Sequence, residues 1–247
     1  MKPVPPEARA KGQPIAVLVD YDGTVATLDI SDELVRRSAS IEAWHLLDSA
    51  YLRGELGSRA LLKAETRLLP RDPAAVMDLV EGQSHDPAFG PFVEYARSRG
   101  VAVEVVSDGL GFYVARGMAE VGLGDVPVYS ADMDFAPGGP TIRFPNGHPT
   151  CVVCGTCKRN RILRHQVAGS HVVYVGDGQS DQYAAAHADT LFAKDRLAEL
   201  CRVRGMSFRP WTDFTYIQSW LEQALRQGDL PGPRQRPFVC GPEVEDR

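Results

Sequence analysis

The sequence predicts an α/β fold in which an open, parallel β-sheet is flanked by helices and carries a small inserted helical domain. Three apolar runs rich in β-branched residues support this prediction, at residues 17–19, 101–106 and 172–175. Each run ends in a polar loop, and helical patterns separate the runs along the chain. Because ligands of such sheets bind beyond the carboxyl ends of the strands, we expect the polar residues after these runs to share one edge.

Two aspartates, Asp20 and Asp22, follow the first run. Residues i and i+2 of an extended segment point the same way, so both carboxylates are expected to project from the end of the strand. They repel each other unless a cation or a shared proton relieves them, and Gly23 lets the chain turn closely around a ligand. The pair suits a nucleophilic carboxylate, a neighbouring proton donor and a divalent metal. An Asp-rich turn without a catalytic role is the alternative.

The segment after this pair is predicted to be a helical insertion. Ser31 can cap a helix with an acidic first turn, and the apolar positions that follow indicate several helices and no strand. The expected divisions of the chain are a flexible leader, a sheet domain in two parts, the insertion and a flexible tail: residues 1–13, 14–30 with 87–227, 31–86, and 228–247.

Beyond the insertion, helical and strand patterns continue to alternate. Helices are expected where apolar residues recur with helical spacing: residues 92–100, 112–121, 158–167, 181–188, 197–204 and 214–226. Strands are expected at short apolar runs: residues 101–106, 126–129, 172–175 and 191–193. The segment 131–149, rich in Gly and Pro, contains a further short strand at 141–144 and is expected to form an edge hairpin.

Candidate phosphate-binding residues follow the second run and open a later helix. The hydroxyl of Ser107 and the amides of Asp108 and Gly109 can donate hydrogen bonds to a phosphate at a helix start. Lys158 opens a helical pattern, where its charge can offset that of a phosphate. A helix cap and a solvated surface lysine are the alternatives for these residues.

Candidate metal ligands follow the third run. Asp177 and Asp181 lie in a loop with two glycines, and their carboxylates together with that of Asp20 offer the oxygen ligands that Mg²⁺ prefers. The alternative for this loop is a capped helix start, because Ser180 and Asp181 can both serve as caps.

These four motifs together resemble those of the haloacid dehalogenase superfamily. They are Asp20-x-Asp22-Gly23-Thr24, Ser107, Lys158 and Gly176-Asp177-Gly178-x-x-Asp181, and the separations between Asp20, Ser107, Lys158 and Asp177 are 87, 51 and 19 residues. The insertion has the position of the helical cap in the phosphoserine-phosphatase-like branch. The resemblance covers residues 14–227 and implies a Rossmannoid parallel sheet with a small α-helical cap that closes over the active site.

The resemblance also implies a role for each motif residue. Asp20 is expected to be the nucleophile that forms an aspartyl-phosphate, and Asp22 the general acid and base. The residues expected at Mg²⁺ are Asp20, Asp22, Asp177 and Asp181, and those expected at the phosphate are Ser107, Asp108, Gly109 and Lys158. Asp29, at the entrance to the insertion, is expected to face the substrate, with helix capping or a hinge as an equal alternative.

Cys151, Cys154 and Cys157 form a further cluster just before the motif lysine. Their two-residue spacing is common in zinc sites, and His148 can supply a fourth ligand. A structural Zn²⁺ is therefore one hypothesis, and a reduced loop packed near the lysine is the other. This run, like residues 191–214, resembles the phosphatases of methionine salvage that act on 2-hydroxy-3-keto-5-methylthiopentenyl-1-phosphate.

Composition narrows the range of functions. The chain has 247 residues and a net charge of −5, which argues against a nucleic-acid partner. No apolar run approaches the roughly 18 residues that span a bilayer, and the first residues lack the apolar stretch of a secretory signal. No membrane partner and a cytoplasmic location are therefore expected. Five cysteines, an odd number, argue against a disulfide framework.

The predicted function is that of a Mg²⁺-dependent phosphatase, a phosphoric monoester hydrolase that acts on a small phosphorylated metabolite through an aspartyl-phosphate. A methionine-salvage-type or a sugar- or ketose-like phosphate ester is the expected substrate. Phosphoserine-phosphatase-like and phosphotransferase or phosphomutase activities are alternatives, and a non-catalytic binding protein is an alternative of another class. The oligomeric state is open, with a homodimer as one alternative.

Overall fold

The computed structural model describes residues 13–228 and residue 230, which divide into two compact units. In the described part, the first unit contains residues 13–19, 86–104 and those from 158 onward, and the second contains residues 20–85 and 105–157. The strand β2 (Ala102–Leu110) begins in the first unit and continues into the second. The expected leader and tail, residues 1–13 and 228–247, lie almost wholly outside the described residues.

The sheet is mostly parallel, and within the described part of the chain its strand order is β4-β3-β2-β1-β5-β6-β7. In the first unit, β1 (Ile15–Val19) pairs in parallel with β5 (His171–Gly176), which pairs in parallel with β6 (Thr190–Ala193). A short strand, β7 (Arg209–Pro210), pairs with β6. All residues of β1 and β5 are buried, as expected for central strands covered on both faces.

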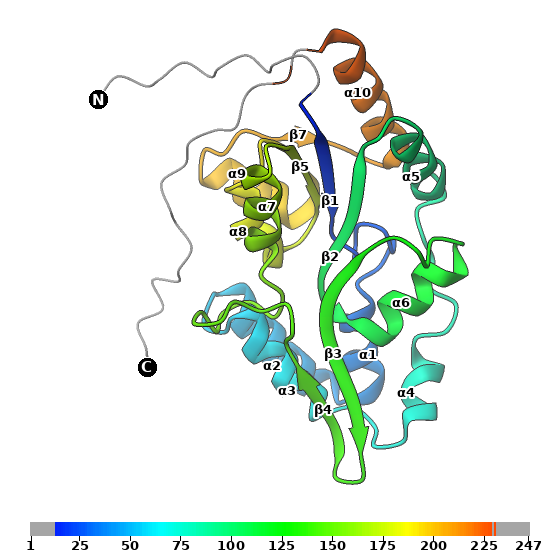
Figure 1. Ribbon diagram of the computed structural model, residues 1–247. Coiled ribbons are helices and arrows are strands. Elements are labelled where there is room, and N and C mark those ends of the chain that lie inside the picture. The colour runs from blue at the N-terminus through cyan, green and yellow to red at the C-terminus, as the bar shows by residue number, and fades with distance from the viewer. Residues whose placement is uncertain (1–12, 229, 231–247) are drawn as a thin grey trace. The chain divides into compact units, whose positions relative to one another are not determined.

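Helices cover both faces of the sheet in the first unit. Figure 1 shows α5 (Phe89–Ser98) and α10 (Phe214–Gln227) together on one side. On the other side lie α7 (Lys158–Val167), α8 (Gln182–Ala185) and α9 (Asp195–Val203). The 3₁₀ turn η1 (Gln179–Asp181) directly precedes α8.

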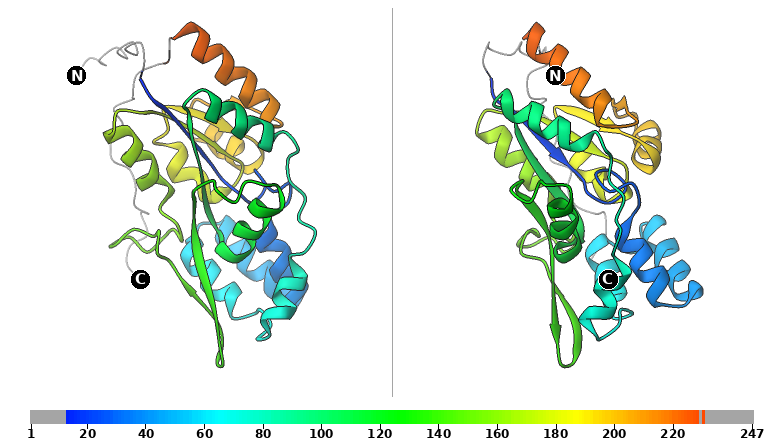
Figure 2. Two further views of the ribbon diagram at one scale, coloured as in Figure 1. Left: turned by 45° about the vertical axis from the view of Figure 1, so that its right-hand side comes forward. Right: turned by 90° about the vertical axis from the view of Figure 1, so that its right-hand side faces the viewer.

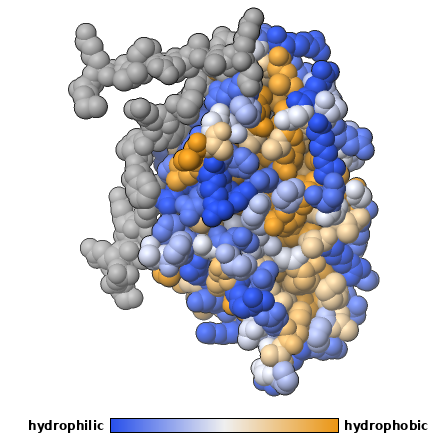
Figure 3. All heavy atoms as spheres, in the orientation of Figure 1, coloured by the Kyte–Doolittle hydropathy of each residue, from blue (hydrophilic) through white to orange (hydrophobic). Residues whose placement is uncertain are grey.

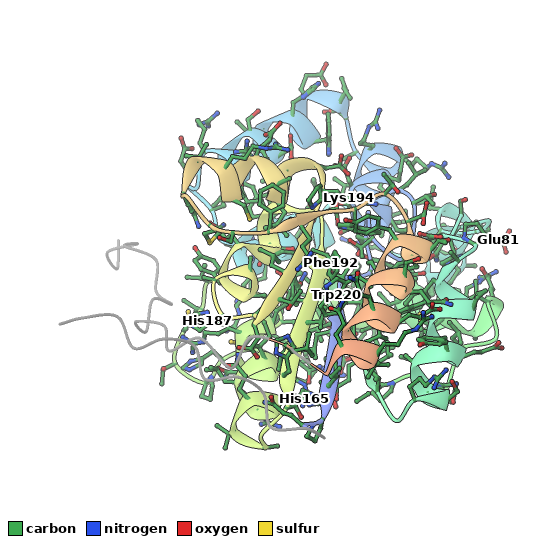
Figure 4. The ribbon with its side chains drawn as sticks, turned by 90° about the horizontal axis from the view of Figure 1, so that it is seen from above. Glu81, His165, His187, Phe192, Lys194 and Trp220 are labelled. Carbon is green, nitrogen blue, oxygen red and sulfur yellow. The ribbon has the colours of Figure 1, made fainter. Side chains whose placement is uncertain are left out.

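Aromatic contacts fix α10 in this unit. The ring centroid of Phe214 is 4.7 Å from that of Phe89 and 5.3 Å from that of Phe92. Farther along the same helix, Trp220 meets Phe192 of β6 with ring centroids 5.2 Å apart (Figure 4). The last helix therefore packs against both the sheet and α5, which stabilises the unit from which the third and fourth motifs project.

The second unit combines four consecutive helices with a helix–strand layer. The four helices, α1 to α4, span Ile30–Ser38, Ile41–Leu52, Ser58–Thr66 and Pro73–Leu79. Three of them begin at capping side chains, since Asp29, Ser40 and Asp72 accept hydrogen bonds from amides of the first turns. These helices occupy the segment in which the sequence predicts a helical insertion.

The remainder of this unit is built around β2. It pairs in parallel with β3 (Val128–Ala136), which forms an antiparallel hairpin with β4 (Gly139–Arg143), drawn as a long ribbon in Figure 2. Helix α6 (Gly111–Glu120) packs on β3. The edge hairpin expected from the sequence is confirmed.

Four elements differ from the sequence expectations. The strand expected at 126–129 is longer and lies later in the chain, since β3 spans Val128–Ala136. Residues Ser107 to Gly109, expected as a loop, lie within β2, because Ser107 and Asp108 are buried and find hydrogen-bonding partners there. The helix expected at 181–188 is shorter, since a 3₁₀ turn precedes the four-residue α8. The strand β7 has only two residues, too few for a hydropathy pattern to reveal.

The surface shown in Figure 3 mixes hydrophilic and hydrophobic residues. None of the helices in the described residues is long and apolar enough to cross a membrane.

Candidate functional site

The first motif is a tight turn at the end of a buried strand. Asp20 is buried, and one of its carboxylate oxygens accepts a hydrogen bond of 2.8 Å from the Tyr21 amide. The Tyr21 carbonyl in turn accepts bonds from the amides of Thr24, Val25 and Ala26. Gly23 has a φ of 68°, a left-handed conformation that favours glycine. The turn thus holds the two aspartates on a short, hydrogen-bonded loop.

Asp22 is held from three directions within the second unit. Its Oδ1 accepts a hydrogen bond of 2.9 Å from the Ile30 amide at the start of α1. Its Oδ2 accepts one of 2.8 Å from the Tyr113 hydroxyl and a longer contact of 3.4 Å from Ser107 Oγ. The first and second motifs are therefore brought together around one carboxylate.

Tyr113 is a site residue that sequence reasoning missed. It is fully buried on α6, and its pKa is well above the ordinary value because of burial first and the charge of Asp22 second. Its hydroxyl therefore stays protonated and donates to Asp22 across the working pH range. A tyrosine at an apolar position of a helix gives no signal in the sequence that separates this role from core packing.

Gly109 lies where β2 comes closest to the side chains of Tyr113, Asp22 and Ser107. A Cβ atom there would overlap the Tyr113 hydroxyl and the Asp22 carboxylate, and would lie 2.9 Å from Ser107 Oγ. The Gly109 amide donates a 2.8 Å hydrogen bond to Ser107 Oγ. The close approach of β2 to Asp22 therefore requires a glycine at this position. This packing requirement is separate from the phosphate-binding role expected for the Gly109 amide.

Asp108 points to the loop that precedes Lys158. Its Oδ1 accepts a short hydrogen bond of 2.6 Å from the Thr156 amide. Nearby, the Cys157 amide donates to the Asn146 carbonyl at 2.8 Å, and Arg59 Nε donates to the Cys154 carbonyl at 3.0 Å. The Asp108 side chain therefore anchors this loop, whereas the phosphate role expected for its amide stays a prediction.

In the first unit, Lys158 and Asp181 form a buried ion pair. Their exposed fractions are 3% and 0%, and Lys158 Nζ lies 2.7 Å from Asp181 Oδ1 and 3.1 Å from Ser180 Oγ. Lys158 is thus not the solvated surface lysine of the alternative interpretation. The third and fourth motifs are joined through this pair.

Asp181 organises the loop that carries Asp177. Its Oδ1 also accepts from the Tyr174 hydroxyl at 2.5 Å, and its Oδ2 accepts from the amides of Asp177 and Gly178 at 3.1 and 3.0 Å. Burial raises the pKa of Asp181, but the charge of Lys158 and these hydrogen bonds outweigh it and leave the pKa below the ordinary value. The side chain is therefore an ionised anchor for the loop.

Asp20 and Asp177, two of the expected metal ligands, each follow a strand of the sheet. Val19 of β1 pairs with Val175 of β5, so the two strands end together. Asp20 is bonded directly to Val19, and Asp177 follows Gly176, the last residue of β5. The two strands therefore end at one edge of the sheet, whereas a common site for these aspartates stays a prediction.

Asp29 caps α1 through a 2.8 Å hydrogen bond from the Asp32 amide to its Oδ1. This is one of the two roles expected for it, and the substrate-facing role stays a prediction.

The hypothesis of a structural zinc is not supported. Within the described residues, Cys151, Cys154, Cys157 and His148 do not form a group that can hold a metal ion. His148 instead uses its Nδ1 to accept hydrogen bonds from the amides of Thr150 and Cys151, at 3.2 and 3.0 Å. A two-residue cysteine spacing was misleading here because the loop is organised by backbone and side-chain hydrogen bonds.

Comparison with known proteins gives relatives in one family. Residues 17–186 match the haloacid dehalogenase-like hydrolases. A protein of Exiguobacterium sibiricum named 2-hydroxy-3-keto-5-methylthiopentenyl-1-phosphate phosphatase is 31% identical over 215 residues, which are 84% of this chain and 96% of that protein. A protein of the same name from Brevibacillus brevis is 30% identical over 220 residues, 86% of this chain and 97% of that protein.

Solved structures show the same fold. A substrate-bound phosphoserine phosphatase has a TM-score of 0.67 at 18% identity, over 84% of this chain and 98% of that chain. A phosphoserine phosphatase with an analogue of the phospho-aspartyl intermediate has a TM-score of 0.66, also at 18% identity, over 84% and 99%. The sequence-based identification of a phosphatase of this superfamily is confirmed. This chain belongs to the haloacid dehalogenase-like hydrolases.

Proposed function

We propose that this hydrolase removes phosphate from a small phosphate monoester through an aspartyl-phosphate on Asp20. The observation that carries the proposal is the fixed Asp22 carboxyl, which α1, β2 and the Tyr113 hydroxyl hold in place two residues from the buried Asp20. A nucleophile with an oriented acid beside it is what a two-step displacement needs.

The two steps use these side chains in turn. A carboxylate oxygen of Asp20 attacks phosphorus, the bond from phosphorus to the leaving oxygen breaks, and the proton of Asp22 passes to that oxygen. Asp22 then takes a proton from water, whose oxygen attacks phosphorus, releases phosphate and restores the Asp20 carboxylate. Lys158, held rigidly by Asp181 and Ser180, supplies positive charge for the phosphoryl oxygens.

The acidic residues at the sheet edge fit Mg²⁺. Asp20, Asp177 and Asp181 are a candidate group of oxygen ligands, and hard oxygen donors are those that Mg²⁺ prefers. Because both oxygens of Asp181 are already bonded to Lys158, Tyr174 and loop amides, we assign direct ligation to Asp20 and Asp177 and a supporting role to Asp181. When bound, the ion would neutralise charge on the transferring phosphoryl group.

The substrate that we propose first is the one in the name of the curated relatives, 2-hydroxy-3-keto-5-methylthiopentenyl-1-phosphate. Helices α1 to α4 would act as the cap that receives its leaving group, since they follow the first motif directly along the chain. The Ser107 hydroxyl would take part in phosphate binding, because it lies beside Asp22. The Gly109 amide would hold this hydroxyl in place through its hydrogen bond to Ser107 Oγ.

A steady-state assay with Mg²⁺ tests the proposal. Wild-type protein should hydrolyse p-nitrophenyl phosphate and the proposed substrate, and Asp20→Asn should lose at least about 100-fold in kcat because the attacking carboxylate is gone. The matched control is Asp78→Asn, an exposed aspartate of α4, which should leave kcat unchanged. Full activity of Asp20→Asn, or an equal loss in both variants, would overturn the assignment.

A further inference from the structure

Tyr21 lies between the proposed nucleophile and the proposed acid, and its hydroxyl has no part in the chemistry described above. The residue is 0% exposed. Its hydroxyl donates a hydrogen bond of 2.6 Å to Gln83 Oε1 and lies 2.9 Å from His85 Nε2. Burial first, and the charge of Asp22 second, raise the pKa of Tyr21 far above its ordinary value, so the hydroxyl keeps its proton. The loop that carries Asp20 and Asp22 is therefore attached through this hydroxyl to residues 83–85.

The hydrogen bonds of this network have defined directions. Gln83 Nε2 donates to the carbonyls of Val80 and Tyr113, both at 3.3 Å, so Oε1 is the atom that accepts from Tyr21. Since the single proton of the Tyr21 hydroxyl goes to Gln83, the contact with His85 requires His85 Nε2 to be the donor. The three side chains thus form a continuous chain of hydrogen bonds from His85 through Tyr21 to Gln83.

Gln83 also connects the two tyrosines that lie beside the aspartates. Tyr113, whose carbonyl accepts from Gln83, donates through its own hydroxyl to Asp22 Oδ2 at 2.8 Å. The ring centroids of Tyr21 and Tyr113 are 6.1 Å apart. One side chain therefore restrains both the loop that contains Asp20 and the donor that orients Asp22.

Helix α6 leaves room for this network at a glycine. A Cβ atom on Gly117 would overlap the Tyr21 hydroxyl and would lie 2.7 Å from His85 Nε2 and 2.8 Å from Gln83 Oε1. A side chain at this position would displace all three polar groups. The network is therefore closely packed as well as hydrogen-bonded.

Gln83 and His85 belong to the segment by which the chain leaves the helical insertion. They follow α4, the last of its helices. This segment runs beside the one by which the chain enters the insertion, because Ala26 and His85 form an antiparallel bridge and the Thr27 amide donates to the Ser84 carbonyl at 2.8 Å. The end of the insertion is thus joined to its beginning and, through Tyr21, to the loop of the first motif.

We infer, on the basis of the proposed phosphatase function, that Gln83 and His85 are positioning residues that act through the Tyr21 hydroxyl. They hold the loop that carries Asp20 and Asp22 in the geometry that the displacement needs, and they make this geometry depend on the end of the helical insertion. A misplacement of about 1 Å can lower the rate of a reaction about 100-fold. Because the network acts on the loop and not on the substrate, it determines kcat rather than KM.

Steady-state kinetics on p-nitrophenyl phosphate, corrected for the folded fraction of each variant, test this role. Tyr21→Phe should lower kcat about tenfold and leave KM within about twofold, and so should Gln83→Met, which can neither accept from Tyr21 nor donate to Tyr113. The double variant should be at most about twofold slower than the slower single variant, because residues that act as a unit are not additive. Gln223→Met, at an exposed glutamine of α10, is the control and should behave as wild type.

His85 offers a matched pair of variants. His85→Gln keeps an N–H donor close to the position of Nε2 and should retain kcat within about threefold, whereas His85→Leu has no donor and should lose about tenfold. A structural effect of replacing the ring would lower kcat in both variants alike.

Hydrogen exchange tests the same connection without an activity measurement. The amides of Thr24, Val25 and Ala26 donate to the Tyr21 carbonyl, and they should exchange at least about tenfold faster in Gln83→Met than in wild type because the loop opens more often. Exchange in the hairpin of β3 and β4 should be unchanged.

Three results would overturn the inference: a normal kcat in Tyr21→Phe, losses that multiply in the double variant, or equal exchange rates at these amides in Gln83→Met and wild type. If Tyr21→Phe does not fold, the two His85 variants and the exchange measurement decide. Failure of the proposed function is distinguishable, because wild type would then not hydrolyse p-nitrophenyl phosphate, whereas the exchange rates would still report on the network.

Discussion

At the scale of single residues, the neighbours of a buried carboxyl group decide whether its pKa is lowered or raised. Asp181 is completely buried yet ionised, because Lys158, Tyr174 and two amides compensate its charge. Glu65 is nearly as buried, and its pKa moves in the opposite direction because of burial first and the charges of neighbouring acids second. The same functional group thus serves as a fixed anion in one place and as a neutral acid in another.

Tyr113 should matter for turnover more than for stability. Tyr113→Phe removes the 2.8 Å hydrogen bond to Asp22 Oδ2 and leaves that oxygen only the longer contact with Ser107. We expect kcat for p-nitrophenyl phosphate to fall about tenfold, as for a misoriented general acid, with a loss of about 1 kcal/mol in the free energy of unfolding. Tyr95→Phe, on α5, is the control. A normal kcat in Tyr113→Phe would show that Asp22 does not need this donor.

The titration of Glu65 should make stability depend on pH in a predictable direction. The pKa of the carboxyl is about 8 in the folded protein, against 4.5 ordinarily, so between these values the folded state binds more protons than the unfolded state. Stability from this group is therefore complete below pH 4.5 and is lost as the pH rises through 8. Burial is the largest cause of the raised pKa of Glu65, and the negative charges of four neighbouring acids add to it: Asp29, Asp32, Asp48 and Asp22.

Glu65→Gln cannot lose a proton and should remove this dependence. We expect the free energy of unfolding of the variant, relative to wild type, to increase by a few kcal/mol, on the order of magnitude given by linkage, from pH 5 to pH 9. Urea unfolding at both pH values measures it. A difference between the two proteins that stays constant with pH would contradict the assignment of the titration to Glu65.

At the scale of elements, a side chain of β2 holds in place the loop that precedes Lys158. Its buried Asp108 accepts a 2.6 Å hydrogen bond from the Thr156 amide, and Lys158 begins α7 two residues after Thr156. The side chain of one motif thus holds the backbone just before another. The start of α3 adds to this restraint, since the Arg59 amide donates a hydrogen bond of 2.9 Å to the Val153 carbonyl.

Asp108→Ala should loosen the segment before Lys158. Loss of the hydrogen bond leaves a buried amide without its acceptor, so we expect the free energy of unfolding to fall by about 1–3 kcal/mol. Hydrogen exchange should become faster at the Thr156 and Cys157 amides, whereas exchange in β5 should be unchanged. Asp108→Asn keeps an oxygen acceptor and is the matched control, which should show a smaller loss. Equal exchange rates in wild type and Asp108→Ala would reject the anchoring role.

The sequence identified most elements because apolar periodicity and capping residues depend on local chemistry. The strands β1 and β5 and the helix α1 could be predicted in this way. The extension of β2 through Ser107 could not, since polar residues continue a strand only where distant partners satisfy them. The same reason hides Tyr113, whose role depends on a hydrogen bond to a residue far along the chain. The expected cap Ser31 was wrong, because α1 begins one residue earlier and is capped by Asp29.

At the scale of the whole molecule, the acidic residues come from strands that are distant in sequence and adjacent in the sheet. Asp20 continues the chain from β1, and Asp177 follows β5, which pairs with β1 in parallel. This arrangement explains why Asp20 and Asp177 could be predicted to follow strands that end at a common edge of the sheet.

Binding of Mg²⁺ should therefore stabilise the folded protein as well as support turnover. Activity on p-nitrophenyl phosphate should vanish in EDTA and return with Mg²⁺, whereas Ca²⁺ should support it poorly because Ca²⁺ prefers more oxygen ligands and a looser geometry. Since the unfolded chain has no such site, saturating Mg²⁺ at about 100 times its Kd should add about 2.7 kcal/mol to the free energy of unfolding. Asp177→Asn should abolish this gain, and Asp195→Asn, at the start of α9, should retain it. A gain in stability that is the same in Asp177→Asn as in wild type would place the ion elsewhere, and full activity in EDTA would show that the reaction does not need it.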